Sequence, residues 1–249
     1  MNEITLLDCG RCKNPLWHTH LPEHLNRIYY IHDGIMFYGD PGQEYQFRKD
    51  HLYFLPQNID FVVRQSSEQP VDHTFIDFIS FPPISLERFV EINPDTLPFF
   101  RSSLNLLLEL IGKHSSISLL YDRTPLIKSY TQYLMELINQ TYPISYLKDQ
   151  RILRVIEYMQ AHFTEDIRIQ DLADLVNLDT NYFFRRFKKA TSVSPHQYLK
   201  TIRICHCINL LRCGYSVSEA AERSGYSSVS SFSQVFKKET GKAPSDVRL

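Results

Sequence analysis

The chain has 249 residues, of which 43% are hydrophobic and 22% are charged, with 8 glycines and 13 prolines. This composition excludes a disordered or fibrous protein, and the length predicts two domains of roughly 100 to 150 residues. No stretch approaches the roughly 18 consecutive apolar residues of a membrane span, and the N-terminal MNEI lacks the layout of a secretory signal. We therefore expect a globular protein of the cytoplasm with no membrane partner.

Charge is distributed unevenly along the chain, although the formal net charge is only −1. Residues 1–149 hold 12 basic against 18 acidic residues, a net −6, whereas residues 150–249 hold 15 against 10, a net +5. A basic C-terminal part favours a polyanionic partner. The cysteines are Cys9, Cys12, Cys205, Cys207 and Cys213. Their odd number and two distant clusters argue against a disulfide framework.

Short apolar and aromatic runs, separated by turn residues, fill the chain up to about residue 83. The runs cover residues 28–31, 35–38, 52–55, 61–63 and 75–81. Runs of this length between Gly, Pro, Asp and Asn predict the strands of an antiparallel sandwich or small barrel.

The apolar spacing becomes helical from about residue 97. It predicts one helix around residues 104–111 and a second over residues 124–142, which Pro143 ends. The second helix has an apolar stripe from Leu126 to Ile138. A core helix and a subunit contact both require such a stripe, so the sequence leaves both interpretations open.

An internal repeat dominates the region after residue 150. The run FKKATSVSP at residues 187–195 recurs as FKKETGKAP at residues 236–244, which is 49 positions later. Before each copy, the spacing predicts a short helix around Ala173 or Ala221 and a turn at the Asn or Gly four positions later. Alanine lets helices approach closely, and Asn or Gly accepts the left-handed backbone of a tight turn. The sequence therefore predicts two helix-turn-helix units.

Helical spacing also predicts which side of each second helix is free. Phe183 with Phe187, and Phe232 with Phe236, have core spacing and should pack inward. The side chains that remain outward are Asn181, Phe184, Arg185 and Lys188 in the first unit, and Ser230, Ser233, Gln234 and Lys237 in the second. Arg can pair with guanine, Gln with adenine and Lys with phosphate. A solvated face would look similar, but the doubled motif favours base contacts in successive major grooves, with a spacer helix starting at Pro195.

On these residues the sequence resembles the AraC/XylS family of transcriptional regulators. The resemblance covers residues 150–249, and the residues that carry it are Ala221, Gly225, Tyr226, Ser227, Ser194, Pro195 and the Phe-Lys-Lys ends of both second helices. It implies a bipartite domain for double-stranded promoter DNA, whose base-facing positions are Asn181, Arg185, Ser230 and Gln234. Two positions depart from the family pattern: Ser192 replaces a usual glycine, and Phe184 places an aromatic ring on the reading face.

The N-terminal half also resembles the cupin-like effector domain of that family, through His18-Thr19-His20, the Tyr29-Tyr30-Ile31 run, residues 52–56 and residues 73–75. The resemblance implies a barrel that binds a small-molecule effector, for example a sugar, at His18, His20, His73 and Phe75. It also implies a homodimer and, for an activator, contact with RNA polymerase. Period-two alternation places His73 and Phe75 on one strand face, but it leaves open which face is inward.

A rival interpretation is a metal-dependent cupin enzyme fused to a DNA-binding domain. Cys9 and Cys12, followed by His18 and His20, supply ligand types that zinc prefers. However, the metal-cupin pattern is incomplete, and no Gly-x-Ser-x-Gly nucleophile elbow is present. We therefore expect no metal, no cofactor and no enzymatic activity, with the two cysteines as buried thiols.

Together these observations predict an α+β regulator in three parts. Residues 1–96 form a cupin-like β-barrel that senses an effector, residues 97–147 form a helical connector that is a candidate for dimerisation, and residues 148–249 form an all-α double helix-turn-helix domain. The predicted function is sequence-specific DNA binding that responds to a small molecule. The sequence leaves open the effector, the operator and the choice between activation and repression.

Overall fold

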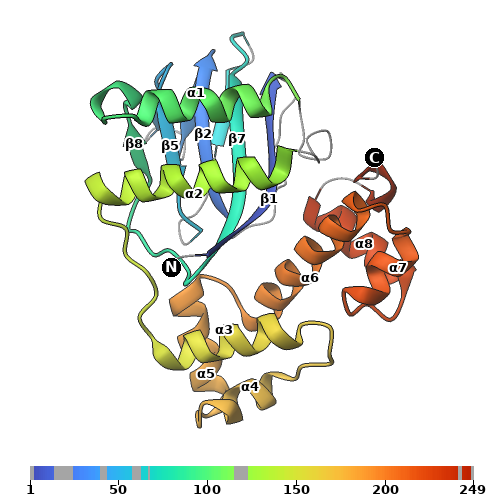
Figure 1. Cartoon of the computed structure of the whole chain (residues 1–249). Coiled ribbons are helices and arrows are strands. Elements are labelled where there is room, and N and C mark those ends of the chain that lie inside the picture. Colours follow the sequence, from blue (N-terminus) through green and yellow to red (C-terminus); the bar gives the residue numbers. More distant parts are fainter. Residues whose placement is uncertain are drawn as a thin grey trace. The chain divides into compact units, whose positions relative to one another are not determined.

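The structure is a computed structural model that describes residues 3–13, 25–39, 44–57, 63–66, 68–114, 123–240 and 243–247. The described chain forms two compact units, which meet in the sequence between Tyr146 and Leu147 (Figure 1). Within the described ranges, no helix combines the length and the hydropathy needed to cross a membrane.

Antiparallel strands build the N-terminal unit. They are β1 (Glu3–Lys13), β2 (Asn26–Asp33), β3 (Met36–Tyr38), β4 (Tyr45–Gln46), β5 (Leu52–Leu55), β6 (Val63–Gln65), β7 (Asp72–Phe81) and β8 (Val90–Ile92). The larger sheet has the order β1-β7-β2-β5-β8, and the smaller sheet has the order β4-β3-β6. The sequence does not predict β1, β4 or β8, because β1 contains a glycine and several charges and the other two are very short. Most of the predicted run at residues 61–63 lies outside the described residues.

Two long helices, α1 (Phe100–Ile111) and α2 (Thr124–Thr141), cover one face of the larger sheet, after the short 3-10 helix η1 (Pro94–Thr96) (Figure 1). Buried side chains of both helices and of the sheet form one apolar core, which includes Leu104, Leu107, Leu134, Ile138, Ile28, Phe54 and Phe78. The predicted stripe of α2 therefore lies in this core at Leu134 and Ile138, whereas Leu126 at its start is 53% exposed.

The other face of the larger sheet packs against the smaller sheet. The core between the two sheets contains Tyr29, Ile31, Met36, Phe47, Tyr53, Leu55 and Val71. The rings of Phe47 and Tyr53 stack with their centroids 3.9 Å apart. On β7, Phe75 packs against this second core, while Phe78 belongs to the core under the helices. Both faces of the larger sheet are thus covered, and His73 and Phe75 face the smaller sheet.

The C-terminal unit is helical. Its elements are α3 (Gln150–His162), α4 (Ile169–Leu175), α5 (Thr180–Thr191), α6 (Pro195–Arg212), α7 (Val217–Arg223), α8 (Val229–Thr240) and the 3-10 helix η4 (Pro244–Val247). The pairs α4–α5 and α7–α8 are the two predicted helix-turn-helix units, one before and one after α6. The predicted α+β class, with antiparallel sheets followed by helices, is confirmed at this level.

The turn of each helix-turn-helix unit has the predicted geometry. Ala173 and Ala221 are fully buried between their helices. Four positions later, Asn177 and Gly225 adopt left-handed backbones with φ of 53° and 80°. The residue after each turn donates its N–H to the carbonyl of the buried alanine at 3.0 Å. The local sequence signals therefore correspond to local backbone geometry.

Candidate nucleic-acid interface

Helix α5 is the second helix of the first unit. It begins after Asp179, whose carboxylate accepts the backbone N–H groups of Asn181 and Tyr182 at 3.0 Å. Phe183 and Phe187 are fully buried and anchor the helix, as predicted. The four side chains predicted to face outward, Asn181, Phe184, Arg185 and Lys188, are all exposed. The free face of α5 therefore combines an amide, an aromatic ring and two cations.

Helix α8 repeats this arrangement in the second unit. Phe232 and Phe236 are fully buried. The predicted outward residues Ser230, Gln234 and Lys237 are exposed. Ser233 is half-buried, and its hydroxyl donates to the carbonyl of Val229 at 2.8 Å, so it stabilises its own helix turn.

The charge on both faces is available to a partner. Neither Arg185 nor Lys188 nor Lys237 forms an ion pair within the described part of the chain. Lys189 and Lys238, the second lysines of each Phe-Lys-Lys run, are exposed as well and add to this charge. These two lysines were not among the residues predicted to face outward, although the repeat contains both.

Arg186 has a structural role that its neighbour Arg185 lacks. Its guanidinium donates to Asp149 at 2.6 Å and to the hydroxyl of Tyr182 at 2.9 Å. Asp149 also accepts backbone N–H groups at the start of α3. Since Asp149 precedes α3 and Arg186 lies on α5, this ion pair attaches α5 to the start of the C-terminal unit.

Helices α5 and α8 both contact α6. The Phe187 ring of α5 meets the Tyr198 ring of α6 edge-on, with centroids 5.7 Å apart. Glu239 of α8 accepts from Lys200 at 2.6 Å and from Gln197 at 3.0 Å, both on α6. The 18 residues of α6 span about 27 Å at 1.5 Å per residue, a length comparable to one helical turn of DNA at about 34 Å.

Within the C-terminal unit, a junction that the sequence did not predict joins α6 to the loop after α3 and to the second helix-turn-helix unit. Arg203 of α6 donates to the carbonyls of Phe163 and Glu165, after α3, at 2.6 and 2.7 Å. The same guanidinium lies over the Tyr226 ring at 5.9 Å. Tyr226 directly follows the turn glycine Gly225, which was the one signal for this junction in the sequence. The junction restricts how α6 and the second helix-turn-helix unit are oriented relative to the first helix-turn-helix unit.

The departure at Ser192 is accommodated at the end of α5. Ser192 has φ of 66°, the left-handed conformation that glycine adopts more easily. The helix end is therefore formed as the family pattern implies, with a serine in the strained position.

The residues predicted to contact an effector lie in the N-terminal unit. His18 and His20 are outside the described residues. His73 is only 1% exposed and meets the Tyr29 ring edge-on at 5.0 Å. On the same sheet face, Arg27 and Asp77 form a buried, bidentate ion pair with N–O distances of 2.5 and 3.0 Å. No group of three metal-ligating side chains occurs among the residues that the structure describes.

Burial lowers the pKa of His73 from 6.5 to about 4. An unfolded histidine keeps the higher value, so the unfolded chain binds more protons between these pH values. We expect the free energy of unfolding of the N-terminal unit to fall by about 2–3 kcal/mol as the pH is lowered from 7 to 4.5. Urea denaturation at both pH values, compared between wild type and His73→Phe, isolates this contribution. Equal pH dependence of the two proteins would show that His73 is not responsible.

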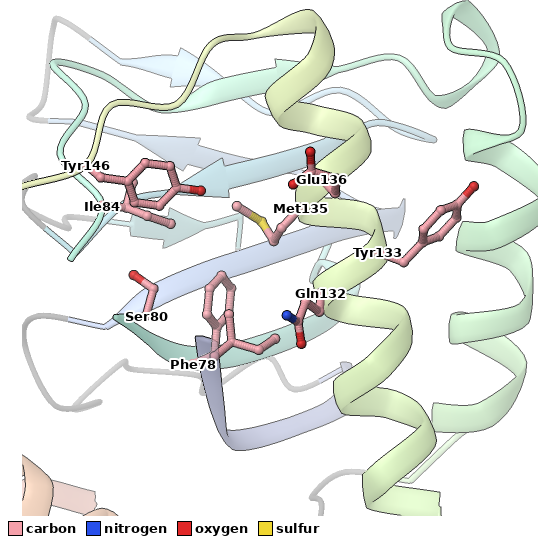
Figure 2. Close-up of a pocket in the computed structure, with 9 residues that line it drawn as sticks. Phe78, Ser80, Ile84, Gln132, Tyr133, Met135, Glu136 and Tyr146 are labelled. Atoms are coloured by element: carbon pink, nitrogen blue, oxygen red, sulfur yellow. The ribbon is translucent and has the colours of Figure 1, made fainter. Parts of the chain in front are cut away.

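A separate cavity of 290 Å³ lies between α2 and the larger sheet (Figure 2). Its lining residues are Ile4, Phe78, Ser80, Ile84, Gln132, Tyr133, Met135, Glu136 and Tyr146. It lies on the face of the sheet opposite to His73 and Phe75. The sequence did not predict it, because its lining comes from three separate segments, at residue 4, residues 78–84 and residues 132–146.

Comparison with known proteins supports this view of the C-terminal unit. Residues 172–249 match the family described as a helix-turn-helix domain. The HTH-type transcriptional activator RhaS of Citrobacter koseri is 30% identical over 101 residues, 40% of this chain and 36% of that relative. An uncharacterised HTH-type transcriptional regulator of Staphylococcus aureus is 29% identical over 103 residues, 41% of this chain and 14% of that relative. The matches thus cover little more than a third of these relatives at most.

Among solved structures, ToxT from Vibrio cholerae has a similar fold over 98% of this chain and 97% of that chain, with a TM-score of 0.59 and 15% identity. This likeness concerns the fold alone. The paired helix-turn-helix units, the matched domain family and the similar regulators agree with one another. Residues 172–249 of the chain are therefore similar to the helix-turn-helix domains of transcriptional regulators such as RhaS.

Proposed function

We propose that this protein is a transcriptional regulator that binds promoter DNA in a sequence-specific manner and responds to a small molecule. The observation that carries the DNA-binding part is the pair of exposed, cationic faces on α5 and α8, both attached to α6. Each face offers a bidentate group, Arg185 or Gln234, with a lysine at the next helical turn. Such a face suits base edges at its centre and phosphates at its margin.

On both faces, individual side chains have different roles. Asn181, Arg185, Ser230 and Gln234 contact base edges, whereas Lys188 and Lys237 contact phosphates. Phe184, with 37% of its surface exposed, meets a thymine methyl. Ser233 contributes through the helix turn that it closes.

Arg185→Ala is expected to weaken binding to a cognate site by about 1–3 kcal/mol and to remove the preference at one base position. Lys188→Ala should weaken binding to all sequences alike and lower the salt slope by about one unit, because one phosphate contact is lost. A site selected by the protein from random DNA and a scrambled site, compared by fluorescence anisotropy, measure both effects.

The matched control is Arg154→Ala, since Arg154 is an exposed arginine on α3, outside both reading faces. Its loss should leave the specificity unchanged. If Arg185→Ala weakens cognate and scrambled DNA by the same factor, Arg185 is a phosphate contact and the assigned reading face is rotated.

For the N-terminal part we propose a cupin-like barrel that senses an effector over residues 1–96, and a connector over residues 97–147 that contributes to a homodimer. ToxT structures have been solved with an unsaturated fatty acid and with (E)-4-(8-methylnaphthalen-1-yl)but-3-enoic acid, so a protein of similar fold binds small molecules. Residues 148–249 form the DNA-binding part, which acts in the cytoplasm and contacts RNA polymerase where it activates transcription. No enzymatic step is part of this proposal.

A further inference from the structure

The cavity under α2 has an apolar interior. Its buried lining comes from Ile4 of β1, Phe78 of β7, Met135 of α2 and Ile84, which follows β7. Figure 2 shows Met135 extending from α2 towards the side on which Ile84, Tyr146 and Phe78 lie. A space with these walls favours an apolar molecule, because burial of its surface removes it from water.

One polar group interrupts this interior. Ser80 is 4% exposed, lines the cavity and accepts a hydrogen bond from the Asn26 amide at 3.2 Å. Asn26 is itself satisfied, because it also bonds the side chain and the backbone N–H of Gln57. The Ser80 hydroxyl has a proton left to donate, and no acceptor for it lies within hydrogen-bond distance among the described residues. A buried donor of this kind is costly unless a ligand or water accepts from it.

The charge of the lining selects against anions. The nine described residues around the cavity include no Lys, Arg or His, and the only charged one is Glu136 at its exposed margin. A carboxylate placed in this cavity would lose hydration without gaining a cation. The chemistry of the lining therefore favours an uncharged ligand.

We propose that this cavity binds a small, uncharged and mainly apolar molecule that presents a carbonyl or hydroxyl oxygen to Ser80, and that this molecule is the effector of the regulator. The effector role rests on the proposed function, whereas the binding itself does not. The site differs from the interior between the two sheets, where His73 and Phe75 lie. It also selects against the carboxylic acids found in the ToxT structures.

The cavity also touches the segment that leads into the C-terminal unit. Tyr146, a lining residue, pairs with Ile84 in an antiparallel bridge, and Ser85 donates its N–H to the Ser145 carbonyl at 2.9 Å. Three residues after Tyr146, Asp149 caps α3 and pairs with Arg186 on the first reading helix. A ligand packed against Ile84 and Tyr146 restricts this segment and thereby changes the DNA affinity.

The methionines allow a direct binding test by methyl NMR. Among the four methionines of the chain, Met135 lines the cavity, Met36 lies in the core between the two sheets, and Met159 lies in α3. We expect 4-phenylbutan-2-one to shift the Met135 methyl signal in a saturable manner and to leave Met36 and Met159 unchanged. The anion 3-phenylpropanoate, of matched size, should bind at least tenfold more weakly. Saturable shifts at Met36 alone, no shift at all, or equal binding of the anion would each overturn the proposal.

Ser80→Ala tests the hydrogen bond, with Ser103→Ala as the matched control. Ser103 is also a buried serine of this unit, but its hydroxyl donates to the Phe99 carbonyl and lies outside the cavity. Ser80→Ala should weaken ketone binding about two- to tenfold, while Ser103→Ala leaves it unchanged. If Ser80→Ala does not fold, Ser80→Cys keeps the volume with a weaker donor and should also weaken binding. Unchanged affinity in a folded Ser80 variant would contradict the assigned contact.

The effector role has its own measurement. Saturating 4-phenylbutan-2-one should change the affinity of the full chain for its selected DNA site at least threefold in wild type. An unchanged DNA affinity with an occupied cavity would overturn the effector role. Failure of the protein to bind any selected DNA, both without and with the ketone, would instead overturn the proposed function, because the NMR result would remain.

Discussion

Replacing Asp77 with asparagine is expected to reduce the unfolding free energy of the N-terminal unit by about 3–5 kcal/mol, because it leaves a buried guanidinium without its anion. The side chains of Arg27 and Asp77 are 5% and 1% exposed, and they share two hydrogen bonds. Burial raises the pKa of Asp77, and Arg27 opposes this rise. Urea denaturation gives the loss, and hydrogen exchange should locate it in β2 and β7.

Two comparisons separate burial from pairing in this prediction. The double variant Arg27→Met with Asp77→Leu removes both charges and should recover most of the stability, since no buried charge remains. Asp95→Asn breaks the pair between Asp95 and Arg101, whose aspartate is exposed, and should cost no more than about 1 kcal/mol. If Asp77→Asn costs as little as Asp95→Asn, the Arg27–Asp77 pair is not buried in solution.

Gly225→Ala is expected to destabilise the C-terminal unit by about 2–4 kcal/mol, through backbone strain and overpacking together. Gly225 has φ of 80°, and a Cβ at this position would lie 2.8 Å from the Cα and carbonyl oxygen of Thr164. These are backbone atoms, so the clash is relieved only by separating the turn from the loop after α3. Because Arg203 joins the same two segments, the variant should also lower the affinity for DNA that contains both half-sites.

Gly214→Ala provides the matched control for this effect. Gly214 has a similar φ of 84°, but no atom lies within 4 Å of a Cβ placed there. This variant adds only the left-handed strain, which costs about 1–2 kcal/mol. Denaturation of both variants in parallel measures the difference. Equal losses would show that the contact with Thr164 adds nothing to the strain.

The sequence by itself determined the double helix-turn-helix and the exposed side of its second helices. These features depend on local order: a buried alanine, a left-handed Asn177 or Gly225 four positions later, and phenylalanines at helical spacing. Because the repeat has a constant offset, each of these signals occurs twice in the sequence, at corresponding positions. The backbone preferences of Asn and Gly and the helical period act over a few residues, so they are readable without tertiary structure.

Only the tertiary structure decided the contacts between distant segments. Alternation along β7 places His73 and Phe75 on one face, but the smaller sheet and the helices covering opposite faces show which core each face joins. The Arg27–Asp77 pair joins residues 50 positions apart, and the cavity around Ser80 combines β1, β7, α2 and the segment at Tyr146. Such contacts depend on strand order and layer packing, because any strand with a suitable face can serve as the neighbour until the chain is folded.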